Sequence, residues 1–344
     1  RKVLTRAGER LNETASTSSS TTTRATAAQQ DDGAAQSHAL MDLWWERHAS
    51  GLVRYDSRLL VLHAVGDACG EYGWGTVFYS KAREDYKTRV GSLPENQAAT
   101  FDLELMSRLQ LARAGGLNVA ANPNSIVPGH LVIWPEEKRA ELTHADVLDL
   151  SRLARAHGAW TFIHNMEQAA ASIVDWAHFQ AYPWEFPMSH GAAGVAEMLY
   201  ESGDFRVSRL AESYPAYVLA VESKRTENLA AWLFEMLSAL ARGSAASGER
   251  RVPCNVVWRG ASAWLIPRSL AQSALAARYV GAREMGGRVC LPHADSLRRY
   301  LPDALAAEVR GASVAGDAEV RAWCEQAARE TANRLCAGGA VETA

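Results

Sequence analysis

The stretch that decides the fold lies at residues 164–183 and reads His-Asn-Met-Glu-Gln-Ala-Ala-Ala-Ser-Ile-Val-Asp-Trp-Ala-His-Phe-Gln-Ala-Tyr-Pro. Its second half alternates in the way that a half-buried strand requires, because successive side chains leave a strand on opposite faces. The alternation predicts a strand over residues 175–182, with Trp176, His178 and Gln180 on one face.

The imidazole of His178 is the candidate nucleophile of this strand. A neutral imidazole can attack phosphorus with one ring nitrogen while a hydrogen bond to the other nitrogen sets the tautomer. The carboxamide of Gln180 could bind a phosphate oxygen without adding a competing charge. The alternative is that His178 is a structural histidine in the core of a protein that lacks this chemistry.

These residues carry a family resemblance. Ser172-Ile173, followed by His178-Phe-Gln-Ala-Tyr-Pro, resembles the His-x-His-x-Gln strand of the transferase branch of the histidine-triad superfamily. That branch contains galactose-1-phosphate uridylyltransferase, diadenosine tetraphosphate phosphorylase and the GDP-hexose phosphorylases. The GDP-hexose phosphorylases resemble this chain most, since the resemblance extends to a Tyr-Pro-x-x-x-Leu-x-x-Glu segment, which here runs from Tyr214 to Glu222. Trp176 stands where the motif has its first His.

The resemblance implies a nucleotidyltransferase of the phosphorylase type. Its substrate would be a nucleotide sugar of the GDP-hexose type or a dinucleotide polyphosphate, cleaved through a covalent nucleotidyl group on His178. Phosphate or a sugar phosphate would then accept the nucleotidyl group, so ping-pong kinetics should result.

The same resemblance implies the substrate contacts. Asn165, Ser172 and Gln180 would bind phosphate oxygens, and Asn122 would contact the bound nucleotide beside a hairpin. A simple turn role is equally compatible with Asn122, which lies in an Asn-Pro-Asn-Ser segment. Trp176 would either stack on a nucleobase or sugar, or fill the volume of the missing imidazole.

The order of expected elements repeats along the chain. The first pass has strands at 130–134, 160–164 and 175–182 and a helix at 144–157 that begins with a capping box at Thr143. The second pass has strands at 217–221, 254–258 and 263–266 and a helix around 229–240. The repeat and the resemblance predict an α+β fold of duplicated histidine-triad-like units, with mainly antiparallel sheets and covering helices.

We expect a first unit with the active-site strand at residues 41–185, a second unit at 186–300 and C-terminal helices at 301–344. One active site per chain is expected, because the second unit has Ala-Trp-Leu-Ile-Pro where the first has His178. The C-terminal helices are expected to serve packing or oligomerisation, such as formation of a homodimer.

Residues 1–40 are rich in Ser, Thr and Ala. Such a composition cannot bury enough apolar surface to order itself, so we expect a disordered tail. An organelle-targeting segment is the alternative. Without targeting, we expect a cytoplasmic protein.

The charge balance excludes some classes of partner. The chain has 36 Lys and Arg against 39 Asp and Glu, a formal charge of −3. Nucleic acids and anionic membranes both favour a basic face, so we expect neither as a partner. No run of 18 apolar residues that could span a membrane occurs in the sequence.

The five cysteines are scattered and contain no Cys-x-x-Cys pair, which indicates reduced thiols. In the resembling uridylyltransferases a structural zinc is held by an early Cys-x-x-Cys and by the first His of the motif. This chain has neither, so we expect no metal and no other cofactor.

Two other functions stay open. One is a nucleotide-binding homologue that kept the fold and lost the chemistry, with Trp176 marking the loss. The other is a nucleotide hydrolase, although in the hydrolases of the superfamily a third His commonly occupies the position of Gln180.

Overall fold

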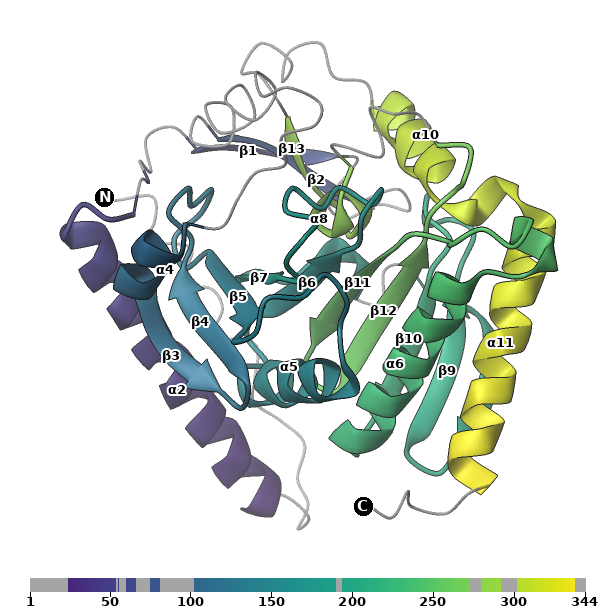
Figure 1. Cartoon of the computed structure of the whole chain (residues 1–344), viewed down its shortest axis with the longest axis horizontal. Helices are drawn as coiled ribbons and strands as arrows, with labels where there is room; N and C mark the ends of the chain where they lie inside the picture. The colour runs from purple at the N-terminus through teal and green to yellow at the C-terminus, as the bar shows by residue number, and fades with distance from the viewer. Residues whose placement is uncertain are drawn as a thin grey trace, which may run out of the picture.

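A ten-stranded antiparallel sheet forms the centre of the protein (Figure 1). The computed structural model describes residues 24–53, 55, 60–65, 75–80, 102–189, 194–272, 280–291 and 302–337. The strands are, in sheet order, β3 (Gln110–Ala114), β4 (Leu117–Ala121), β5 (Leu131–Pro135), β7 (Phe179–Tyr182), β6 (Thr161–Asn165), β11 (Cys254–Arg259), β12 (Ser262–Pro267), β10 (Leu219–Ser223), β9 (Phe205–Leu210) and β8 (Val195–Ser202).

Helices and a smaller sheet surround this centre. The helices are α2 (Arg24–Ala49), α4 (Leu103–Leu109), α5 (His144–Ala156), α6 (Thr226–Arg242), α8 (Ala282–Met285), α10 (Pro302–Ala312) and α11 (Ala318–Ala337). The smaller sheet has the order β1 (Leu60–Val65), β2 (Gly75–Ser80) and β13 (Arg288–Leu291). None of the helices that the structure describes is long and apolar enough to cross a membrane.

The large sheet is built from two copies of one strand pattern. In the first copy β3, β4 and β5 form a meander, α5 follows, and β7 then inserts between β5 and β6. In the second copy β8, β9 and β10 form the meander, α6 follows, and β12 inserts between β10 and β11. The copies meet where β6 pairs with β11 and Asn165 lies opposite Asn255. The α+β fold with a duplicated, mainly antiparallel unit is confirmed.

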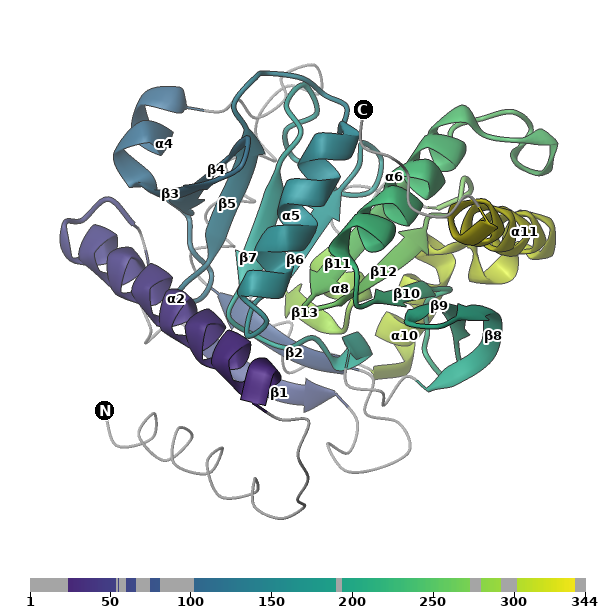
Figure 2. The same cartoon turned by 90° about the horizontal axis from the view of Figure 1, so that it is seen from below.

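The two faces of the large sheet pack against different layers. Helices α5 and α6 lie side by side on one face (Figure 2), where Leu150 and Trp232 pack with Phe179 in one core. On the other face, the smaller sheet, α8 and α10 form a second core with sheet residues such as Ile163 and Tyr182. Strand alternation explains the division, because Phe179 and Tyr182 leave β7 on opposite faces.

Local sequence signals explain the elements around the sheet. The Thr143 hydroxyl accepts from the amide of Asp146 at 3.2 Å, and the Asp146 carboxylate accepts from the amide of Thr143 at 2.8 Å, which is the expected capping box. The Asn-Pro-Asn-Ser segment lies in a hairpin, since β4 and β5 pair and the amide of Asn122 donates to the carbonyl of His130.

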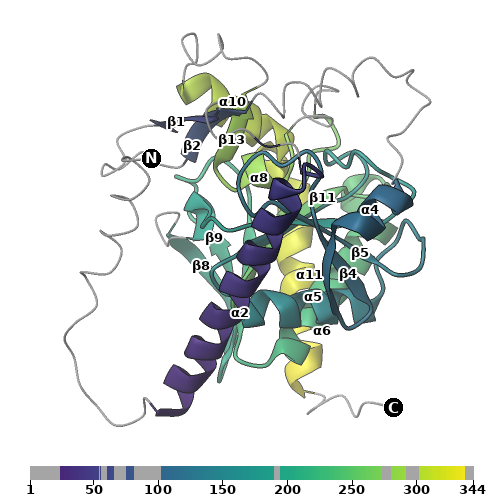
Figure 3. The ribbon, with the colours of Figure 1, turned by 90° about the vertical axis from the view of Figure 1, so that its left-hand side faces the viewer.

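Residues 24–40 of the expected tail belong to α2 (Figure 3). Leu40 and Trp44 are buried in the core, and the guanidinium of Arg47 donates to the carbonyl of Gln110 at the edge strand β3. Composition averaged over the tail does not register the burial of Leu40, because that burial comes from packing against distant segments and not from neighbours in sequence. Residues 1–23, and with them the rest of the predicted tail, lie outside the described residues.

Candidate active site

His178 immediately precedes β7 and is buried. Its Nδ1 lies 3.1 Å from the main-chain carbonyl oxygen of Trp176. A carbonyl oxygen can only accept, so Nδ1 carries the proton and the lone pair resides on Nε2. Burial lowers the pKa of His178 and keeps the ring neutral at pH 7. This is the tautomer that an imidazole nucleophile requires.

A second buried imidazole supports the first. His164, on β6, has its Nδ1 3.0 Å from the carbonyl oxygen of His178 and therefore donates a proton to it. Burial lowers the pKa of His164 to about 4; the hydrogen bond to the carbonyl of His178 opposes this shift, and the positive charge of Arg251 adds to it. His164 is thus a neutral donor that holds the backbone of the candidate nucleophile.

The buried His164 makes stability depend on pH. In the unfolded chain its pKa is 6.5, so between pH 6.5 and about 4 the imidazole is protonated in the unfolded state and neutral in the folded state. The free energy of unfolding should therefore fall as the pH falls through this window. From the size of the shift, His164 contributes about 2 kcal/mol of the difference between pH 7 and pH 4.5.

Urea unfolding at pH 7 and pH 4.5 would measure this dependence. His164→Gln should lose less stability on acidification than the wild type does. His38→Gln, at an exposed histidine of α2, is the matched control and should behave as the wild type. An equal pH dependence of wild type and His164→Gln would contradict a neutral, buried His164.

The segment before β7 corrects the predicted strand. Residues 172–178 are irregular, and pairing with β5 and β6 begins only at Phe179. The amide of Ala177 instead donates to the carbonyl of Arg139 at 2.6 Å, and the indole of Trp176 donates to the carbonyl of Pro135 at 3.4 Å. Because these contacts bind the segment to the end of β5 and to the loop between β5 and α5, strand alternation does not extend to Trp176 and His178.

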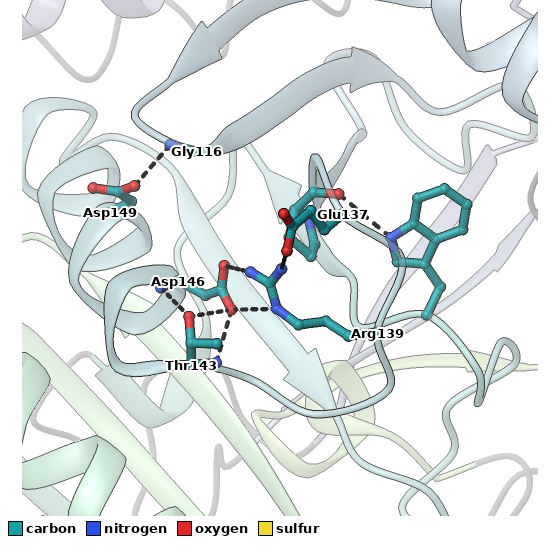
Figure 4. A network of polar contacts seen from close by, with 8 residues as sticks. Gly116, Glu137, Arg139, Thr143, Asp146 and Asp149 are labelled. Atoms are coloured by element: carbon teal, nitrogen blue, oxygen red, sulfur yellow. Dashed lines mark hydrogen bonds and ion pairs between the residues drawn. The ribbon is translucent and has the colours of Figure 1, made fainter.

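That loop is held by an ion pair (Figure 4). The guanidinium of Arg139 donates to both carboxylate oxygens of Asp146, at 2.6 and 3.3 Å. Asp146 is buried and also completes the capping box with Thr143. The start of α5 therefore fixes Arg139, whose carbonyl in turn fixes the residue before His178.

His178 and His164 line a cavity of about 460 Å³ between this loop, the end of β6 and the C-terminal half of α6. Its apolar lining includes Leu142, Ile173, Val174, Trp176, Phe234 and Leu237. Its charged lining consists of Glu141, Glu167, Arg242 and Arg251. The volume is in the range of small-molecule sites, and an apolar wall with a few charges suits a nucleotide.

Asn165 reaches the cavity but is also a structural residue. Its Oδ1 accepts from the amide of Ala282 and from Nδ2 of Asn255, both at 2.8 Å. These bonds join β6 to α8 and to the second copy of the unit. They orient the amide so that only its Nδ2 could donate to a ligand.

Gln180 and Asn122 lie away from this cavity and close to each other. Oε1 of Gln180 accepts from the hydroxyl of Tyr182 at 2.6 Å and lies 3.0 Å from Nε2 of His130. Nδ2 of Asn122 lies 3.3 Å from the same nitrogen of His130, and its Oδ1 accepts from the amide of Asn124 at 2.9 Å, as in a turn. The structure therefore does not place Gln180 in the wall of the cavity that His178 lines.

Of the other two residues predicted for the site, Trp176 lies at the cavity and Ser172 does not. Trp176 lines the cavity, and the ammonium of Lys138 lies 5.9 Å from its ring centroid. Ser172 is half-buried in the irregular segment and does not belong to the lining.

The lining residues that sequence reasoning missed include His164, Arg242 and Arg251. His164 could have been found, because alternation along β6 places it with Phe162, toward α5 and α6. The two arginines had no local signal, because their shared position at the cavity depends on the loop that connects the end of α6 to β11.

Comparisons with known proteins support the fold. Searches with the sequence match no protein-family model and no curated protein. Among solved structures, yeast Ap4A phosphorylase Apa2 matches with a TM-score of 0.59 and 14% identity, over 80% of this chain and 94% of that chain. Its complex with AMP matches with a TM-score of 0.57 and 13% identity, over 80% of this chain and 94% of that chain. Its complex with Ap4A matches with a TM-score of 0.56 and 13% identity, over 80% of this chain and 96% of that chain. The chain therefore shares the fold of Ap4A phosphorylase.

Proposed function

We propose that this protein is a nucleotidyltransferase of the phosphorylase type, in the transferase branch of the histidine-triad superfamily. The observation that carries the proposal is the neutral imidazole of His178, whose protonated Nδ1 faces the carbonyl of Trp176 while the ring lines a cavity of nucleotide size. The substrate is a nucleotide sugar of the GDP-hexose type or a dinucleotide polyphosphate.

The reaction has two displacements. First, Nε2 of His178 attacks the α-phosphorus, so that an N–P bond forms while the P–O bond to the leaving phosphate breaks with its electron pair on that oxygen. The resulting imidazolium keeps its proton on Nδ1, where the carbonyl of Trp176 accepts it. Second, an oxygen of phosphate or of a sugar phosphate attacks the same phosphorus, and the electron pair of the N–P bond returns to Nε2.

The surroundings of His178 favour this chemistry. Donation from His164 to the carbonyl of His178 fixes the backbone, so the ring needs little reorganisation before attack. Nδ2 of Asn165 supports the charge that develops on the nonbridging oxygens. Gln180 would act on phosphate only after leaving its bond with Tyr182.

The test is to trap the intermediate. The protein is incubated with Ap4A or a GDP-hexose in the absence of phosphate and analysed by mass spectrometry. We expect the mass of one nucleotidyl group on His178, which disappears when phosphate is added. Turnover of a substrate without any adduct on His178 would contradict this mechanism.

A nucleotide-binding protein without transfer is the second candidate. It is favoured by Trp176 at the position of the first motif His and by the bond that ties Gln180 to Tyr182, away from the cavity. Such a protein would bind nucleotide but would not exchange labelled phosphate into a nucleotide sugar. The same trapping experiment separates the two candidates.

A further inference from the structure

We infer that Arg242 and Arg251 form the subsite that binds the phosphate chain of a nucleoside diphosphate or polyphosphate in the cavity of His178. The inference rests on the proposed function, because it takes this cavity as the nucleotide site. Both arginines belong to the cavity lining together with His178. They come from the last residue of α6 and from the residues that lead into β11.

The loop between them is built to bring its two ends together. Gly243 ends α6 with a φ of +71°, and a Cβ at this position would lie 2.3 Å from the carbonyl oxygen of Arg250. A residue with a side chain could not allow this approach. The amide of Val252 then donates to the carbonyl of Leu240 at 2.9 Å, which places the neighbouring Arg251 beside the end of the helix.

Hydrogen bonds inside the loop keep it closed. The hydroxyl of Ser247 lies 2.9 Å from the carbonyl oxygens of both Ser244 and Arg250, and it accepts from the amide of Ser244 at 2.8 Å. The arginines are therefore presented by a fixed loop, so a ligand that pairs with both of them loses less conformational entropy on binding.

The positive charges of Arg242 and Arg251 are available to an anionic ligand. Within the described residues neither Arg242 nor Arg251 forms an ion pair, whereas Arg139, Arg209 and Arg334 each pair with a carboxylate. The positive charge of Arg251 also lowers the pKa of His164, another residue of the cavity lining. Guanidinium groups bind phosphate through two parallel hydrogen bonds, which makes a phosphate chain the ligand that matches this end of the cavity.

The remaining lining selects a nucleoside phosphate over inorganic phosphate. Glu141 and Glu167 repel a bare anion but accept hydrogen bonds from sugar hydroxyls. Trp176 and Phe234 give apolar area for a base. A ligand with a base, a sugar and a phosphate chain satisfies all three kinds of lining.

Calorimetric titration of the full chain with ADP and with adenosine tests the subsite. We expect Arg242→Gln and Arg251→Gln each to weaken ADP binding about 10-fold, and the double variant about 100-fold, which is typical of lost charge-assisted hydrogen bonds. Adenosine binding should change less than about 2-fold, since it lacks phosphate. The matched control is Arg250→Gln, an exposed arginine next in sequence that is not part of the lining.

The outcomes separate the subsite from the proposed function. Equal ADP affinity in the wild type and the double variant would overturn the subsite and leave His178 chemistry standing. Binding that depends on the arginines, with no adduct on His178 during turnover, would support the subsite and overturn the transfer mechanism. A wild type that binds neither ADP nor GDP in the same titration would overturn both. Thermal unfolding of each variant, compared with Arg250→Gln, excludes misfolding as the cause of lost binding.

Discussion

Substitution of His178 by alanine is expected to reduce the rate of nucleotidyl transfer by about 10⁴- to 10⁶-fold, which is the loss typical of removing a nucleophile that forms a covalent intermediate. Binding of ADP should remain, because the groups that hold the base and the phosphates are not changed. The loss should therefore affect kcat far more than the dissociation constant of the nucleotide. Steady-state phosphorolysis and calorimetric titration measure the two quantities.

The pH profile gives an independent check on the same residue. The lowered pKa of His178 means that the free ring stays neutral below pH 6.5, so activity should persist there and fall only when the ring itself is protonated. His38→Ala, at an exposed position of α2, should keep the wild-type rate. A His178→Ala protein with more than about a tenth of the wild-type rate would not fit a covalent role.

Substitution of Asp146 by alanine is expected to lower the free energy of unfolding by about 3 kcal/mol. The carboxylate is buried, and its removal leaves the guanidinium of Arg139 with only the exposed Glu137 as a carboxylate partner among the described residues and the start of α5 without half of its capping box. Because the side chain of Arg139 is 27% exposed, water can replace part of the lost interaction, so the value lies at the low end for a broken buried pair.

The matched control for Asp146 is Asp175, which pairs with Lys138 on the surface. Both side chains of that pair are at least half exposed, so Asp175→Ala should change stability by less than about 1 kcal/mol. Urea unfolding at pH 7 measures both variants. We also expect Asp146→Ala to slow transfer, since the loop that bonds to Ala177 beside His178 loses its anchor. Equal stabilities of the two variants would show that the ion pair does not hold this loop.

Much of the fold could be predicted from local patterns. The capping box at Thr143, the hairpin of β4 and β5 and the repeated order of strands and helix all follow from residues that are close in sequence. Such signals work because caps, turns and periodic burial are set within a few residues of each other. His178 also stood out in this way, although its role remains a prediction.

The limits of the site depended on residues that are distant in sequence. The beginning of β7 is decided by Arg139 and Pro135, which bond to the segment before it and remove it from the sheet. The surroundings of Gln180 are decided by His130 and Tyr182 on the face of the sheet away from α5 and α6.

What the sequence by itself determined is the duplicated α+β unit and the imidazole at residue 178, since both are written in short, regular spacings. What only the tertiary structure decided is which side chains share the cavity with that imidazole. His164 comes from a neighbouring strand, Arg242 ends α6, and Arg251 follows a loop closed at Gly243. The physical reason is that packing and hydrogen bonds between distant segments set these neighbours, and no local periodicity records such contacts.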